Sequence, residues 1–131
     1  MKTQQKASLL LYFIRAITIF FGLEASAQNY KSGNQNGVWS PSLNPYIITG
    51  NVVIPEGETL SILPGCKIEI PYGSSLTVNG TLLAKGNVSD SITFIGKDHL
   101  GFTNFGGSII LNNTSSNSNF QYVRVDSLGG N

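Results

Sequence analysis

The chain has 131 residues, of which 40% are hydrophobic and 11% charged, and its formal net charge is +1. This sparse and nearly balanced charge supplies no basic cluster, which argues against nucleic acid or an anionic membrane surface as a partner. Cys66 is the single cysteine, so an intramolecular disulfide is excluded and a small, buried, unreactive side chain is expected.

Residues 1–27 have the features of a secretory signal peptide. Two lysines precede an apolar run over residues 7–23, and Ala25-Ser26-Ala27 is a small-x-small cleavage pattern. A membrane anchor is the alternative, but Arg15 interrupts the run, which is shorter than the roughly twenty apolar residues that a spanning helix needs. We therefore expect export, with no membrane span after signal removal and a secreted or cell-surface location.

Residues 28–45 are predicted to form a mobile segment and an N-terminal cap, because they are rich in Asn, Ser and Gly. Trp39 and the Pro45-Tyr46 pair stand out in and beside this stretch. We expect Trp39 and Tyr46 to lie across the first coil and to shield its apolar end. Stacking against a sugar is the alternative, so both residues are also candidate glycan contacts.

Residues 46–131 repeat an apolar-x-apolar pair followed by a turn that usually contains glycine. Two apolar residues at this spacing lie on one face of a strand, and the turn residues then bend the chain. Such short strands make poor free hairpins, but they form good sides of a solenoid, in which each strand pairs in parallel one coil away. The eight-residue blocks start at Val52, Leu60, Ile68, Leu76, Ala84 and Ile92.

The number of sides in each coil has two solutions. A three-sided coil repeats after 24 residues, with the stacked pairs Val52 on Leu76, Leu60 on Ala84 and Ile68 on Ile92. A two-sided coil repeats after 16 residues and places Leu60, Leu76 and Ile92 in one column. The shorter register matches hydrophobic identity slightly better. We favour three sides because a two-sided tube would be very flat.

A set of motifs runs through most of the chain. It comprises Trp39-Ser40, residues 44–54, 59–68, 76–86 and 92–94, Phe105-Gly106-Gly107-Ser108-Ile109 and residues 120–125. These motifs resemble the opening of secreted, right-handed parallel β-helix proteins of the pectin-lyase-like type. The resemblance covers roughly residues 38–131 and implies an all-β solenoid of about three coils. It implies a fold rather than one activity, because the family includes polysaccharide lyases, hydrolases and adhesins.

The C-terminal end of the pattern is expected to be open. Val123 and Val125 begin another strand, and Gly129-Gly130-Asn131 follow without a polar cap. A solenoid normally closes each end with an atypical repeat, because an exposed strand edge invites association. We therefore expect a fragment or a truncated product, with self-association through the open edge.

Few residues suggest chemistry. The resemblance implies that enzymes on this fold cluster Asp, Arg or Lys on outward positions of one sheet, because acid–base work needs two groups at one sugar bond. Arg124 and Asp126 alternate with inward valines and match best, although a surface ion pair is the expected outcome. Asp98 and His99 lack a third metal ligand. We predict no catalytic site, cofactor or metal in this chain.

Two functions remain open at this point. The first is a structural or binding scaffold at the cell surface, for adhesion or for contact with a polysaccharide or cell-surface glycan, because the outward residues are small and polar. The second is the non-catalytic N-terminal part of a polysaccharide lyase or glycoside hydrolase whose active site lies beyond residue 131. Clustered carboxylates or basic residues on later coils would favour the enzyme.

Overall fold

The computed structural model describes residues 27–129. The predicted signal peptide lies outside the described residues except for Ala27. Within residues 27–129, strands account for about half of the positions, and helix is confined to two three-residue 3-10 turns, η1 (Pro41–Leu43) and η2 (Asn113–Ser115). The expected all-β class is confirmed.

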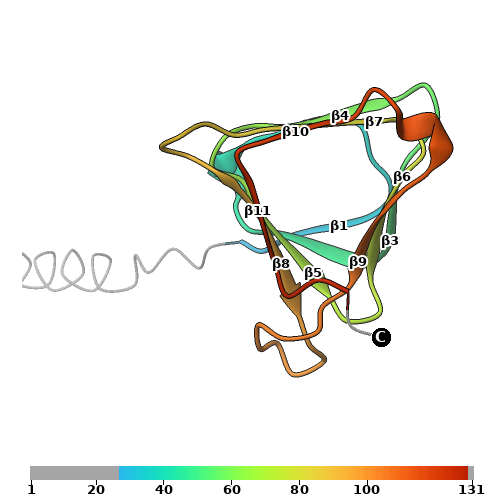
Figure 1. The fold of residues 1–131 in the computed structure, drawn as a ribbon. Coiled ribbons are helices and arrows are strands. Elements are labelled where there is room, and N and C mark those ends of the chain that lie inside the picture. Colours follow the sequence, from blue (N-terminus) through green and yellow to red (C-terminus); the bar gives the residue numbers. More distant parts are fainter. Residues whose placement is uncertain (1–26, 130–131) are drawn as a thin grey trace, which may run out of the picture.

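The strands are short and follow one another around a single core (Figure 1). Their bounds are β1 (Asn29–Asn34), β2 (Gly37–Trp39), β3 (Tyr46–Ile54), β4 (Thr59–Ile62), β5 (Lys67–Pro71), β6 (Ser75–Val78), β7 (Thr81–Lys85), β8 (Ile92–Lys97), β9 (Ser108–Leu111), β10 (Asn119–Gln121) and β11 (Val123–Asp126).

The strands form two sheets, and every pairing is parallel. The larger sheet has the order β11-β8-β5-β3-β6-β9, with β1 added on β3, and the smaller sheet has the order β10-β7-β4-β2. The larger sheet is curled because β3 pairs with β5 through its first half and with β6 through its second half. Gly50, at φ 66°, lies between these halves. In Figure 1 the strands lie along three sides of a triangle.

The register confirms one predicted stack and corrects two. Val52 pairs with Leu76, as the 24-residue repeat predicts. Leu60 pairs with Leu82 instead of Ala84, and Ile68 pairs with Phe94 instead of Ile92. The corner between β6 and β7 has only two residues, whereas the corner between β3 and β4 has four, and a longer corner follows β7. The short corner brings the partner of Leu60 nearer in the sequence, and the long corner moves the partner of Ile68 further away. The average repeat length therefore hides both differences.

The 16-residue alternative is wrong. It placed Leu60 and Leu76 in one column, but Leu60 lies in β4 of the smaller sheet and Leu76 in β6 of the larger sheet. In the smaller sheet the partners of β4 are β2 and β7, and in the larger sheet the partners of β6 are β3 and β9. Strands that follow one another in the chain therefore lie on different sides of the core.

The core consists of the inward members of the alternating strands. Burial alternates along β4 to β8, as the apolar-x-apolar pattern predicts. The side chains that are fully or almost fully buried include Val52, Ile54, Leu60, Ile62, Cys66, Ile68, Ile70, Leu76, Val78, Leu82, Ala84, Ile92 and Phe94. Because these columns stack from one strand to its partner, each layer covers the apolar face of the next.

The first layer differs from the later ones. Residues 29–34, which fall in the segment predicted to be mobile, form β1, and β1 pairs in parallel with β3. Its inward register positions carry Asn29, Lys31 and Gly33 opposite the buried Tyr46, Ile48 and Val52. The layer at this end is therefore polar, although it completes the backbone pairing of β3.

Candidate functional site

The two candidate glycan contacts of the N-terminal cap are buried. The Trp39 and Tyr46 rings stack on each other with centroids 4.6 Å apart and an interplanar angle of 8°. The Tyr46 hydroxyl accepts a hydrogen bond from the Ser40 amide at 2.8 Å and donates one to the Ser40 carbonyl at 3.0 Å. Both rings belong to the hydrophobic core. Neither presents a free face to a sugar in this structure.

The predicted surface pair forms on β11. The Arg124 guanidinium lies 3.2 Å from the Asp126 carboxylate, and both side chains are exposed. Such a pair is screened by water and contributes little to stability. No third ionisable group joins it among the salt bridges of the described residues. The pair alone supplies no acid–base site.

Asp98 and His99 lie in the loop between β8 and β9, where Asp98 has a structural role. Its carboxylate accepts hydrogen bonds from the Leu100 amide at 2.8 Å and the Phe102 amide at 3.0 Å, which shapes the loop. Across residues 27–129, no group of three His, Cys, Asp or Glu side chains is placed to hold a metal ion.

Cys66 is a buried free thiol, and burial raises the pKa of that thiol above its ordinary value. Its Sγ donates to the Trp39 carbonyl at 3.4 Å. Because the thiolate is the reactive form, we expect native Cys66 to resist a thiol reagent at pH 8 and to react once the chain is unfolded in denaturant. Because the pKa of Cys66 is higher in the folded than in the unfolded chain, the neutral thiol contributes its full stability below the unfolded pKa. This contribution is lost as pH rises through the folded pKa. Rapid native labelling at the unfolded rate would contradict the burial.

A more promising site surrounds Tyr72, at the corner between β5 and β6. The Tyr72 amide donates to the Lys97 carbonyl at 2.6 Å, and the Ser74 amide donates to the Pro71 carbonyl at 2.9 Å. Gly73 adopts φ 77°, which lets the chain turn sharply after the tyrosine. These bonds hold the corner, while the Tyr72 side chain stays 57% exposed.

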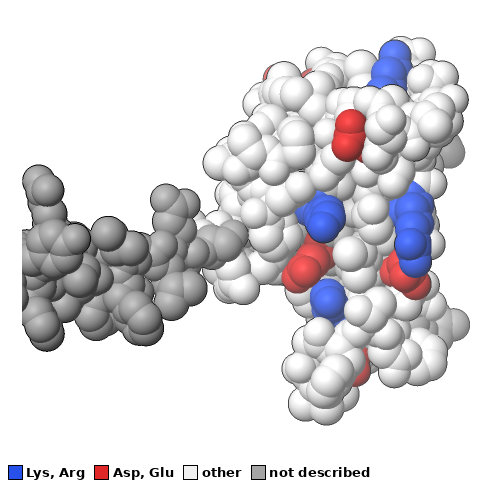
Figure 2. All heavy atoms as spheres, turned by 90° about the vertical axis from the view of Figure 1, so that its left-hand side faces the viewer, with Lys and Arg blue, Asp and Glu red and all other residues white. Residues whose placement is uncertain are grey.

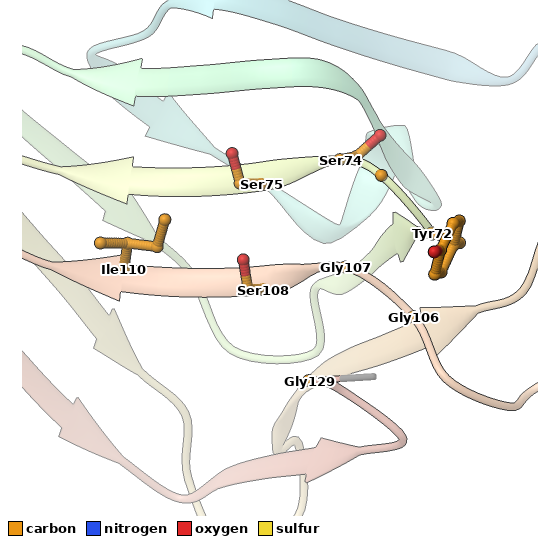
Figure 3. Close-up of a pocket in the computed structure, with 9 residues that line it drawn as sticks. Tyr72, Ser74, Ser75, Gly106, Gly107, Ser108, Ile110 and Gly129 are labelled. Carbon is orange, nitrogen blue, oxygen red and sulfur yellow. The ribbon is translucent and has the colours of Figure 1, made fainter. Parts of the chain in front are cut away.

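A groove of about 380 Å³ lies on one side of Tyr72 (Figure 3). Ser75 and Ser108 occupy paired positions on β6 and β9, and Ile110 lies further along β9. The Ser75 hydroxyl donates to the Asn51 side chain at 2.9 Å, so its lone pairs remain available as acceptors. The groove is lined by Tyr72, Gly73, Ser74, Ser75, Gly106, Gly107, Ser108, Ile110 and Gly129.

A second hollow, of about 420 Å³, adjoins Tyr72 and is lined also by Asp98, His99, Asn104 and Phe105. The Tyr72 and His99 rings meet edge to face, with centroids 6.5 Å apart. Phe105 is exposed, as are two other apolar side chains of the same loop, Leu100 and Phe102. We call Tyr72 and the two hollows that it lines the Tyr72 saddle.

The Tyr72 saddle has the chemistry of a site for a polyhydroxylated ligand. An exposed aromatic face can stack on the apolar C–H face of a sugar ring, and hydroxyl, amide and carboxylate groups can bind its hydroxyls. Neither hollow is lined by Lys or Arg. The lining therefore favours a neutral sugar over a polyanion, which would need cationic partners.

The sequence signal for this site was weak. In the sequence, Tyr72-Gly73 has the composition of a turn, and residues 97–106 show no regular strand pattern. The loop nevertheless carries Leu100, Phe102 and Phe105 without strand alternation. Apolar residues that fit no inward column indicate a surface with another role.

The surface carries charges of both signs, as expected from a composition with few charged residues in nearly equal numbers of each sign. Figure 2 shows one face of the molecule, where Lys and Arg are interspersed with Asp and Glu.

Within the described part of the chain, no helix has the length and hydrophobicity to cross a membrane. No protein-family model, curated protein or solved structure matches this chain.

Proposed function

We propose that this protein is an exported scaffold of the right-handed parallel β-helix type that binds a neutral polysaccharide at the Tyr72 saddle. The all-parallel pairing around three sides supports the β-helix part, and crossovers between parallel strands are right-handed in the great majority of proteins. The signal-peptide features of residues 1–27 support a place at the cell surface or outside the cell.

The observation that carries the binding proposal is the exposed Tyr72 between two hollows. A polymer lying across β6 and β9 would meet hydroxyls on one side of the ring and the side chains of Asp98, His99 and Asn104 on the other. Because the corner is held by backbone hydrogen bonds, the main chain that carries the ring is fixed before the ligand arrives. Preorganisation of this kind lowers the entropic cost of binding.

Replacing Tyr72 with alanine is expected to weaken polysaccharide binding about tenfold or more, because the stacking surface is lost. Affinity electrophoresis through gels containing neutral glucan, galactan or xylan, with polygalacturonate as the anionic comparison, measures the effect. Tyr30 is the matched control, since it is 58% exposed and lies on β1. Tyr30→Ala should leave binding unchanged. Equal loss in both variants, or binding to no neutral polymer, would overturn the proposal.

The Tyr72 saddle would also serve the alternative role, because the non-catalytic start of a polysaccharide-degrading enzyme must hold the same polymer. The two roles separate when a polymer that this chain binds is incubated with a protein that also contains any sequence following residue 131. Release of reducing ends or unsaturated sugars would indicate catalysis by the whole protein, whereas retention of polymer length would favour the scaffold.

A further inference from the structure

The surface formed by β9, β10 and β11 exposes side chains at column positions that are buried throughout β3 to β8. We call it the open end; its strands are the outermost members of the two sheets on that side. Leu111, Phe120 and Val125 are 52%, 39% and 57% exposed, whereas their register partners Val78, Ala84 and Phe94 are fully buried. The columns of the core therefore reach solvent here.

The layers below the open end show what kind of surface fits it. In each of these layers a strand pairs its backbone with the strand of the next layer, and its inward side chains cover the inward side chains of that strand. The open end also has an apolar hollow of about 450 Å³, lined by residues that include Ile109, Phe120 and Leu128. An occupant must therefore offer both strand edges and apolar side chains, because unpaired backbone groups and an apolar patch are exposed together.

The sequence of β11 is complementary to itself. It reads Val123-Arg124-Val125-Asp126. If two β11 edges pair antiparallel with Val125 opposite Val125, Arg124 of each copy faces Asp126 of the other. The two charge pairs then lie on the outward face and the valines on the inward face, as the alternation requires. An isologous two-fold interface demands this reciprocity.

We propose that two copies of this chain join through their open ends, with β11 antiparallel to β11 across a two-fold axis at Val125. The strands β9, β10 and β11 lie on three different sides in Figure 1. A two-fold axis through the β11 side therefore brings β9 of one copy to β10 of the other. Leu111 and Phe120 then cover each other's columns, which removes the apolar patch from water.

A head-to-tail stack fits less well. It would place the open end on the layer of β1 from the next copy, where the inward register positions are Asn29, Lys31 and Gly33. In register, Asn29 would lie on the Val125 column, with Lys31 two positions further along β1, so an amide and an ammonium group would meet β11. Burial of such groups without partners is unfavourable, so the end that carries β1 is a poor complement to the open end.

Charge reversal on β11 tests the proposal. Arg124→Asp places two carboxylates opposite each other at both symmetric positions and is expected to raise the dimer dissociation constant about tenfold or more. The double variant Arg124→Asp with Asp126→Arg restores opposite charges in the antiparallel register and should restore the dimer. Sedimentation velocity of the purified chain over a range of concentrations measures the dissociation constant for each variant.

The controls separate the interface from folding. Both side chains on β11 are exposed, so the variants should unfold at the wild-type temperature when the dimer is dissociated by dilution. Lys67→Asp on the exposed face of β5 is a matched charge reversal away from the open end and should leave the dimer intact. A wild-type monomer at all concentrations, an open-ended series of oligomers, or a double variant as weak as the single one would overturn the proposal.

Discussion

Replacing Ile62 with aspartate is expected to abolish the cooperative unfolding transition. Ile62 is buried in β4, where its register partners are Trp39 on one side and Ala84 on the other. A carboxylate at this position has no hydrogen-bond partner and cannot keep its charge without a large cost. We expect a loss of more than about 4 kcal/mol, which is most of the stability of a small domain. Thermal melts followed by circular dichroism measure it.

Ser61→Asp is the matched control for this substitution. Ser61 precedes Ile62 in the same strand and alternates to the outward face, where it is only half-buried. The same carboxylate there is reached by water and should cost less than about 1 kcal/mol. If Ile62→Asp melted cooperatively at the wild-type temperature, the inward assignment of β4 would be wrong.

Replacing Gly106 with alanine is expected to destabilise the protein by about 3 kcal/mol or more, because there is no space for a methyl group. A Cβ atom on Gly106 would lie 2.0 Å from the Cα of Gly96 and 2.6 Å from the Lys97 amide nitrogen. Both contacts are to backbone, so the corner before β9 would have to separate from β8. The free energy of unfolding in urea measures the change.

Gly101→Ala is the control for this second prediction. Gly101 lies in the same loop, and a Cβ there meets nothing within 4 Å. Its φ of +85° makes alanine strained by roughly 1–2 kcal/mol. The difference between the two variants isolates the close approach of the backbones. Equal losses would contradict the predicted clash between a Gly106 methyl group and the β8 backbone. The Tyr72 saddle includes Gly106, so a polysaccharide-binding measurement on this variant must accompany the stability measurement.

The alternating pattern of the sequence determined the strands and their faces. The third residues of the first four eight-residue blocks share the inward face of each block's first residue by spacing alone, and all four are buried: Ile54, Ile62, Ile70 and Val78. This inference is local, because successive side chains of a strand point to opposite faces whatever lies beyond it. The glycines of the turns were likewise predictable from local sequence, because a sharp turn often needs a positive φ. Gly57, Gly65 and Gly73 all adopt one.

The tertiary structure decided which strands meet. The partner of Ile68 depends on the summed lengths of the corners between β5 and β8, and those corners differ although the inward spacing looks regular. It also decided which aromatic side chains are free. Trp39 and Tyr46 face each other inside the cap, whereas Tyr72 is exposed beside a loop that starts more than twenty positions later.

Side-chain alternation and turn chemistry in the sequence therefore predicted the all-β class, the parallel pairing of short strands and the side chains that face inward. The register and the Tyr72 saddle emerged only in the folded chain. Those features depend on contacts between residues distant in the chain, and a local pattern carries no record of which distant residue will cover it.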